Sequence, residues 1–198
     1  MADEFLADGR NSSVASFFPV CEKAGREDAV GFHFGSTGGE WVAKRFPAAL
    51  WEQILAELPG KKICFGTDSD FYDYAGREIH YQSVSDCSRF TAPDLSDVVE
   101  KIQGLSCFVS NDSGLAKIAT ACGVPTVTLF GPTDPVKNRL NNEVIVRRTD
   151  LRCSGSCQYH ASLMRHCLNR LCLDISPLNI LTEIQRSRTI NANSRDKK

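Results

Sequence analysis

The sequence predicts an α/β fold with a single Rossmann-like, doubly wound parallel sheet. Short apolar runs alternate along the chain with segments whose apolar residues recur at helical spacing. Several of these runs end in turns rich in Gly, Ser, Asn and Asp, as expected where a buried strand leads into a helix. A chain of 198 residues suits one domain. This alternation is typical of βαβ units, whose strand ends line one ligand crevice.

The individual elements follow from these patterns in chain order. We expect strands at residues 29–34, 62–65, 81–84, 107–109 and 126–130. We expect helices with one apolar face at residues 48–58, 94–103, 115–122 and 176–185. Gly123 should end the third helix in a left-handed cap, because Pro125 forbids its continuation. The domain should span 29–185, with a loosely ordered lead-in at 1–28 and a flexible polar tail at 186–198.

Composition narrows the classes of partner. A net charge of −1 gives no overall field that would attract nucleic acid or a membrane surface. No apolar stretch approaches the ~18 residues of a membrane-spanning helix, and the start of the chain has no signal-peptide pattern. We therefore expect a cytoplasmic protein. Its nine cysteines are then expected to be thiols or metal ligands rather than disulfides.

The segment Asn111–Gly114 is a polar turn between a strand and a helix, where Asp112 or Ser113 can cap the helix. Free backbone N–H groups and the helix dipole favour anions at such a turn. We expect Asp112 to accept amide hydrogens and fix the turn, leaving Ser113 and Gly114 to face a phosphate. The alternative is an ordinary capped crossover without a ligand.

A second Gly-rich turn, Gly35–Gly39, follows the first strand and contains the hydroxyls of Ser36 and Thr37. Lys44 or Arg45 could swing over it, so that it forms a second anion site. The order of residues is not that of a Walker A loop. The alternative is a flexible surface loop with solvated cations.

An acidic residue beyond the second strand is a candidate ribose ligand, because such residues often accept hydrogen bonds from ribose hydroxyls in nucleotide-binding sheets. Asp70 is the first choice and Asp68 the second. Either could instead only cap the helix that follows.

Three segments together, 111–115, 123–126 and 130–134, resemble the nucleotide-sugar-binding C-terminal half of the family 9 glycosyltransferases, typified by ADP-heptose:lipopolysaccharide heptosyltransferases. The likeness covers roughly residues 29–184 and implies one half of a GT-B fold. It implies that Ser36 and Thr37 hydrogen-bond diphosphate oxygens and that Lys44 neutralises charge on the departing nucleotide. Lys117 departs from the family, which usually has His there. It could reach a phosphate as a point charge but could not shuttle protons near neutral pH, and it could also be a solvated surface lysine.

A Cys-rich segment at 152–175 contains four thiols in little secondary-structure pattern, at Cys153, Cys157, Cys167 and Cys172. Four thiolates around iron or zinc would close this loop, and His160 or His166 could replace one ligand. The spacing is not the usual paired C-x2-C, and unligated thiols are the alternative. The segment is similar to that of autotransporter protein O-heptosyltransferases, in which such cysteines hold iron and the enzyme assembles into a ring. Both metals accept four sulfurs, so the choice stays open.

The resemblance implies the donor-binding domain of a heptosyltransferase-like enzyme of the lipopolysaccharide-biosynthesis type. It would transfer a heptose or related sugar from an ADP-sugar or other nucleotide-sugar to a glycan or protein hydroxyl, without a catalytic metal. No residue is a convincing catalytic base, so we expect a separate acceptor half or a homo-oligomeric partner. The alternatives are a non-catalytic nucleotide-sugar-binding module and an assembly module built on the metal knuckle. A UDP-sugar epimerase fits less well, because Leu115 stands where such enzymes tend to have a second Gly.

Overall fold

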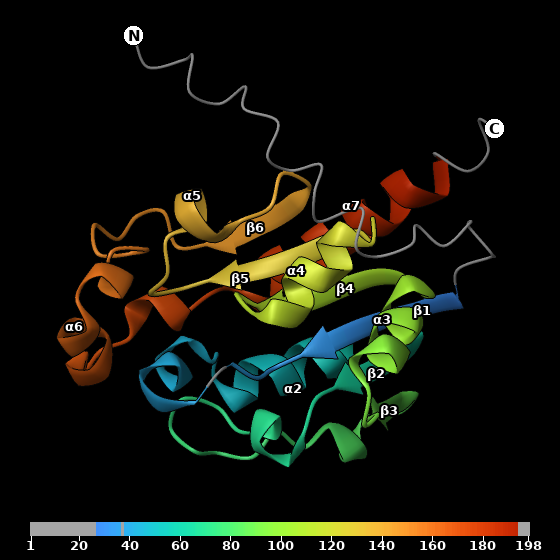
Figure 1. Ribbon diagram of the computed structural model, residues 1–198, viewed down its shortest axis with the longest axis horizontal. Coiled ribbons are helices and arrows are strands. Elements are labelled where there is room, and N and C mark those ends of the chain that lie inside the picture. Colours follow the sequence, from blue (N-terminus) through green and yellow to red (C-terminus); the bar gives the residue numbers. More distant parts are fainter. Residues whose placement is uncertain (1–26, 37, 194–198) are drawn as a thin grey trace, which may run out of the picture.

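The structure is a computed structural model that describes residues 27–36 and 38–193. Its parallel strands form one six-stranded sheet in the order β3-β2-β1-β4-β5-β6 (Figure 1). The strands are β1 (Glu27–His33), β2 (Lys61–Phe65), β3 (Cys87–Phe90), β4 (Leu105–Asn111), β5 (Thr126–Phe130) and β6 (Glu143–Arg147). Successive strands are added on one side of β1 up to β3 and on its other side from β4 onward. The carboxyl ends of β1 and β4 therefore flank the point where ligands bind in such sheets.

Helices cover both faces of the sheet (Figure 1). One face packs against α2 (Ala48–Glu57) and α7 (Pro177–Asn193), and the other against α3 (Leu95–Gln103) and α4 (Gly114–Ala121). The remaining short elements are α5 (Pro135–Asn138), α6 (Ala161–His166) and the 3-10 helices η2 (Gly39–Lys44), η3 (Asp68–Phe71), η4 (Tyr81–Ser83), η5 (Cys157–Tyr159) and η6 (Leu171–Leu173). These short helices lie in the loops that connect the strands with the four longer helices.

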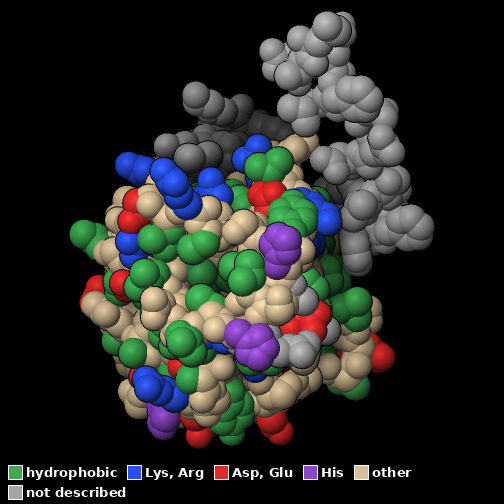
Figure 2. Space-filling view, turned by 90° about the vertical axis from the view of Figure 1, so that its left-hand side faces the viewer, with side chains coloured by type: hydrophobic (Ala, Val, Ile, Leu, Met, Phe, Trp, Pro, Cys, Tyr) green, Lys and Arg blue, Asp and Glu red, His purple; other side chains and the backbone are tan. Residues whose placement is uncertain are grey.

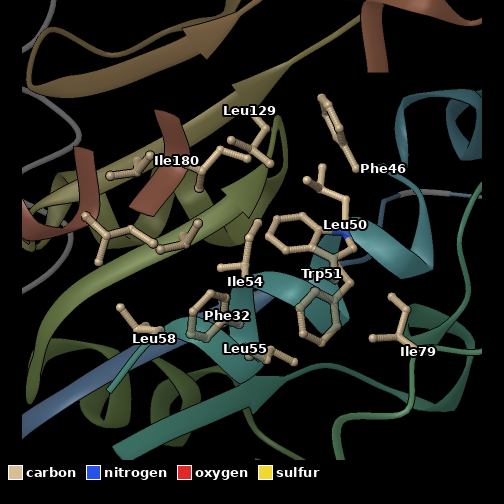
Figure 3. Packing of buried hydrophobic residues seen from close by; sticks show 14 of the residues in the cluster. Phe32, Phe46, Leu50, Trp51, Ile54, Leu55, Leu58, Ile79, Leu129 and Ile180 are labelled. Carbon is tan, nitrogen blue, oxygen red and sulfur yellow. The ribbon is translucent and has the colours of Figure 1, made fainter. Parts of the chain in front are cut away.

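The larger core lies between the sheet and the α2/α7 layer. Trp51 of α2 is fully buried, with its ring centroid 5.0 Å from that of Phe34 and 6.5 Å from that of Phe32. Figure 3 shows Phe32, Trp51, Leu129 and Ile180, from four different elements, in this core. Neighbouring residues of a strand point to opposite faces. In β4, Cys107 and Val109 therefore pack in the larger core, whereas Phe108 between them packs in a second core on the other face. Both cores fix the strand ends that carry the polar turns.

Most predicted elements lie within two residues of the observed ones. Gly123 has a φ of +71°, which confirms the left-handed helix end. Ser113 is the cap of α4, since its Oγ accepts a hydrogen bond from the Ala116 amide at 3.3 Å. The edge strand β6 was not predicted.

The predicted strand at 81–84 is wrong. Tyr81 begins the 3-10 helix η4 and its ring packs 4.7 Å from that of Phe71, so its burial comes from a turn rather than from a ladder. The edge strand β3 forms further on, after Asp86, whose carbonyl accepts the Lys62 amide at 2.8 Å.

The ends of the described chain also differ from the prediction. Glu27 and Asp28 belong to β1, whereas the rest of the predicted lead-in lies outside the described residues. The last helix does not end at 185, because α7 continues to Asn193. Within the described part of the chain, no helix combines the length and apolar character that spanning a membrane requires.

Candidate functional site

A cavity of about 690 Å³ opens at the carboxyl edge of the sheet. It is lined by residues that follow four neighbouring strands: Asp70 after β2, Ser36 after β1, Asp112 at the end of β4 and Thr133 after β5. Residues of both polar bends, Ser36 of the first and Asp112, Ser113 and Gly114 of the second, thus face one cavity.

A buried side chain connects the two bends directly. Asn111 Nδ2 donates to the Phe34 carbonyl oxygen and to the Gly35 carbonyl oxygen, the latter at 3.4 Å. Asn111 is fully buried at the end of β4. The start of the first bend is therefore held against the start of the second.

The cavity lining includes every predicted nucleotide-sugar ligand that the structure describes, namely Ser36, Lys44, Asp70, Asp112, Ser113, Gly114 and Lys117. The remaining predicted ligand, Thr37, lies outside the described residues. The structure therefore brings these side chains together, and their roles toward a ligand stay predictions.

Asp112 lies between two lysines. Lys44 Nζ is 3.7 Å from its Oδ2, and Lys117 Nζ is 3.4 Å from its Oδ1. Burial lowers the pKa of Lys44, whereas the Asp112 carboxylate raises it and Lys117 lowers it. The Asp112 side chain is only 8% exposed, so it serves as the counter-charge that keeps two cations in the cavity.

Lys117 is paired, and its side chain is only 26% exposed. Its Nζ lies 2.9 Å and 3.0 Å from the two carboxylate oxygens of Glu143, whose side chain is fully buried on β6. The ammonium group also lies 5.2 Å from the centroid of the Phe130 ring. The alternative of a solvated surface lysine is therefore wrong, and Lys117 is a fixed cation beside Asp112.

Arg45 does not line the cavity beside the first bend. It is buried and stabilises the bend through hydrogen bonds. The guanidinium is buried and donates to the Ser36 carbonyl oxygen at 3.0 Å and to Ser36 Oγ at 3.2 Å. Ser36 Oγ in turn donates to the Trp41 carbonyl oxygen at 2.8 Å. Lys44 is therefore the cation of this pair that lines the cavity.

Asp70 has one of the two roles that the sequence left open, that of a helix cap, and its role toward a ribose stays a prediction. Its Oδ2 accepts hydrogen bonds from Thr67 N and Oγ1, both at 2.9 Å, and so caps η3. Its Oδ1 lies 3.7 Å from Arg45 Nη2 and 3.9 Å from His33 Nε2. A Cβ on Gly35 would lie 1.9 Å from Oδ1, so only glycine lets the first bend approach this carboxylate.

His33 is a cavity residue that the sequence analysis missed. Its Nδ1 lies 3.1 Å from Ser113 Oγ and 3.3 Å from Ser110 Oγ. Burial lowers the pKa of His33 to about 4; Asp70 opposes this shift, and Arg45 adds to it. The imidazole is therefore neutral at pH 7. Ser113 was expected to face the ligand, yet its hydroxyl is engaged in this cluster and in the helix cap. The sequence does contain a signal for His33, because this residue ends the first strand and lies two residues before the glycine-rich turn.

The wall on the β5 side was also missed. Thr133, Lys137 and Asn138 come from the segment after β5, and Gln158 comes from the Cys-rich segment. The rigid sequence after Phe130 marks an exit loop but does not show which side chains turn into a cavity. Gln158 lies so far from the other motifs in the sequence that no spacing rule connects it with them.

The four cysteines of the Cys-rich segment are thiols whose side chains influence one another. Burial and, to a smaller extent, the neighbouring thiols Cys157, Cys167 and Cys153 together raise the pKa of Cys172 to about 11. Cys157 and Cys172 are buried, whereas Cys153 is exposed. Among the described residues, no three His, Cys, Asp or Glu side chains are arranged so that they could hold a metal ion. The donor set suits a metal, but the thiols do not converge on one point.

The sheet order, the helices on both faces and the cavity at the switch point define a Rossmann-like domain of the GT-B type. Residues 11–166 match the profile described as glycosyltransferase family 9 (heptosyltransferase), and the chain belongs to this family. The resemblance in the segments from 111 to 134 is thereby confirmed.

Relatives and solved structures agree with this assignment. The chain is 27% identical over 194 residues to lipopolysaccharide heptosyltransferase 2 of Salmonella typhimurium strain LT2, covering 90% of this chain and 51% of the relative. The fold is similar to that of E. coli ADP-heptose lps heptosyltransferase II, with a TM-score of 0.62 and 22% identity over 91% of this chain and 53% of the other. It is also similar to the iron-containing dodecameric glycosyltransferase TibC from enterotoxigenic E. coli H10407, with a TM-score of 0.60 and 19% identity over 88% of this chain and 48% of the other. The chain thus spans about half the length of these proteins.

Proposed function

We propose that this chain is the donor-binding half of a heptosyltransferase-like enzyme. It binds an ADP-sugar or another nucleotide-sugar, whose heptose or related sugar passes to a hydroxyl of a glycan or protein. The observation that carries the proposal is the single cavity shared by the two bends and Lys44. Its family and its match to about half of longer heptosyltransferases support it. So does the solved complex of TibC with ADP-D-beta-D-heptose.

The diphosphate lies between the two bends. The α4 N-terminus, at Ser113 and Gly114, presents backbone N–H groups and the positive end of the helix dipole to it. Ser36 lines the facing side. Asp70, at the β2 end of the cavity, accepts hydrogen bonds from the ribose hydroxyls.

In the reaction, the bond between the anomeric carbon and the diphosphate oxygen breaks as the acceptor oxygen forms a new bond to that carbon. Negative charge then develops on the departing nucleoside diphosphate, and Lys44 stabilises it. The acceptor proton needs a base. The two carboxylates that line the cavity, Asp70 and Asp112, already face cations, and His33 is buried and hydrogen-bonded. The base and the acceptor site are therefore assigned to a separate half.

Binding calorimetry tests the proposal. ADP and ADP-heptose should bind the full chain, and Lys44→Met should weaken ADP binding about tenfold or more, since hydrogen bonds to charged groups contribute about 1.5–3 kcal/mol. Adenosine binding should change little. Lys61→Met is the matched control, because Lys61 begins β2 at the opposite edge of the sheet. Binding of none of these ligands, nor of UDP-sugars, at millimolar concentration would contradict the proposal. Equal losses for ADP and adenosine would contradict the role of Lys44.

The Cys-rich segment has a structural role in this proposal. Cys153, Cys157, Cys167 and Cys172 would hold one iron or zinc ion, which would have to draw the four thiols together, since they do not converge in this structure. The mutual effects of the thiols on pKa support this, and so does the similar fold of TibC, which is an iron-containing glycosyltransferase. Elemental analysis of purified protein should find about one metal ion per chain, and Cys157→Ser should lower that content. Iron and zinc both far below one per chain would contradict it.

Exposed apolar side chains of the Cys-rich segment favour a partner on this side of the molecule. Tyr159, Leu163, Leu168 and Leu171 are each at least half exposed, and Leu168 is 96% exposed. Figure 2 shows hydrophobic side chains among charged ones on the face that includes this region. The acceptor half or a second copy of the chain would cover them. A non-catalytic assembly module is the second candidate function, and it predicts no sugar transfer when an acceptor half is added.

A further inference from the structure

The β5 side of the cavity carries two polar atoms that are buried and have no hydrogen-bond partner among the described residues, Thr133 Oγ1 and Gln158 Nε2. Both residues line the cavity, and Thr133 is only 1% exposed. A buried polar group without a partner carries the full cost of its lost hydration. Because both residues line the cavity, a ligand that brings hydroxyl groups against this wall would supply the partners that the two atoms lack.

The orientation of Gln158 is fixed by its neighbours. Asn138 Nδ2 donates to Gln158 Oε1 at 2.6 Å and lies 3.5 Å from Asp112 Oδ2. Because a carboxylate only accepts hydrogen bonds, Asn138 directs its NH2 group toward Asp112. The same NH2 group faces Gln158, so the side-chain atom of Gln158 that it contacts is the oxygen. The NH2 group of Gln158 keeps its donors. The backbone amide of Gln158 donates to the Pro132 oxygen at 3.2 Å, which sets the residue beside Thr133.

The order of strands indicates which part of a ligand would reach this wall. Along the carboxyl edge the cavity residues run from Asp70 after β2, past the bends after β1 and β4, to Thr133 after β5. Neighbouring strands are about 4.8 Å apart. A nucleotide-sugar is a linear molecule of nucleoside, two phosphates and sugar. This step rests on the function proposed above: with the ribose at Asp70 and the diphosphate between the bends, the sugar extends toward β5.

We propose that Thr133 and Gln158 form the subsite for the hydroxyls of the donor sugar. Thr133 Oγ1 both donates and accepts, as a sugar hydroxyl does, and Gln158 Nε2 donates. Asn138 is the positioning residue, since it holds the Gln158 amide in one orientation. The subsite recognises a polyhydroxylated sugar and makes no contact with the nucleotide.

Calorimetry on the full chain with ADP and ADP-heptose tests the subsite. Thr133→Val and Gln158→Met keep the approximate size of each side chain and remove its hydrogen-bonding groups. Each should weaken ADP-heptose binding about threefold to tenfold, the range for loss of one or two neutral hydrogen bonds, and leave ADP binding unchanged. Thr133→Ser keeps the hydroxyl and should bind ADP-heptose as the wild type does. Gln185→Met, on the exposed side of α7, is the matched control and should change neither affinity.

The possible results separate this subsite from the function on which it rests. Wild-type affinity for ADP-heptose in both Thr133→Val and Gln158→Met would overturn the subsite alone. Equal loss of ADP and ADP-heptose binding would also overturn it, because the residues would then shape the whole cavity. Wild-type protein that binds neither ligand would overturn the proposed function and the subsite with it.

Discussion

His33 makes the stability of the domain depend on pH in a way that can be calculated. In the unfolded chain a histidine has a pKa of about 6.5, whereas burial lowers the pKa of His33 in the folded chain to about 4. Asp70, on η3, opposes this shift, and the cations Arg45 and Lys44 add to it. Between these two pH values the unfolded state binds more protons than the folded state. The contribution of neutral His33 to the free energy of unfolding is therefore fully present above pH 6.5, and it is lost as the pH is lowered toward 4.

The size of the effect follows from the two pKa values. Each pH unit in this range costs up to about 1.4 kcal/mol, so the whole interval corresponds to about 3 kcal/mol. His33→Gln cannot titrate and should lose this part of the pH dependence. Urea unfolding, followed by tryptophan fluorescence from pH 7 to pH 4, measures the free energy of unfolding of both proteins. The difference between wild type and variant isolates the contribution of His33, because the titration of the carboxylates is largely the same in both. His80→Gln, at an exposed histidine beside Glu52, is the matched control. Parallel stability curves for wild type and His33→Gln would refute the reasoning.

Two further substitutions test the framework of the cavity. Glu143→Gln removes the charge of a fully buried side chain that contacts Lys117, and we expect a loss of about 1–3 kcal/mol in the free energy of unfolding; an unchanged urea midpoint would contradict this. Gly35→Ala places a Cβ 1.9 Å from Asp70 Oδ1 and should cost about 1–3 kcal/mol through overpacking, measured by thermal unfolding. Gly38→Ala, whose Cβ would meet nothing within 4 Å, is its control, and equal effects of the two alanines would argue against the close approach at Gly35.

The sheet was largely predictable because its central strands are short apolar runs that end in polar turns. The strand at 126–130 was predicted with its exact bounds. In contrast, β6 was not predicted, although its apolar run 144–146 is as long as the run predicted at 107–109. Charged residues flank this run on both sides, and one of them, Glu143, is a buried carboxylate that is paired with a lysine of α4. The strand at 81–84 was predicted wrongly because, in sequence, an aromatic residue that is buried in a turn looks the same as one that is buried in a strand.

The candidate site was predictable where a residue follows a strand end, as Ser36, Asp70 and Gly114 do. Which partner each side chain meets could not be read in the same way. The two lysines on Asp112 come from separate elements, η2 and α4, and their approach depends on the packed sheet. Gln158 reaches the cavity only because the Cys-rich segment folds back against the loop after β5.

The central claim is that the two bends bind one diphosphate, and an NMR titration of the 15N-labelled chain with ADP tests it most directly. The amide resonances of Gly35 and Ser36 in the first bend and of Ser113 and Gly114 in the second should shift together, with one dissociation constant. Adenosine should leave the Ser113 and Gly114 resonances largely unmoved while it affects those near Asp70, which include Gly35. Shifts confined to one bend, or two bends that titrate with different dissociation constants, would contradict the account.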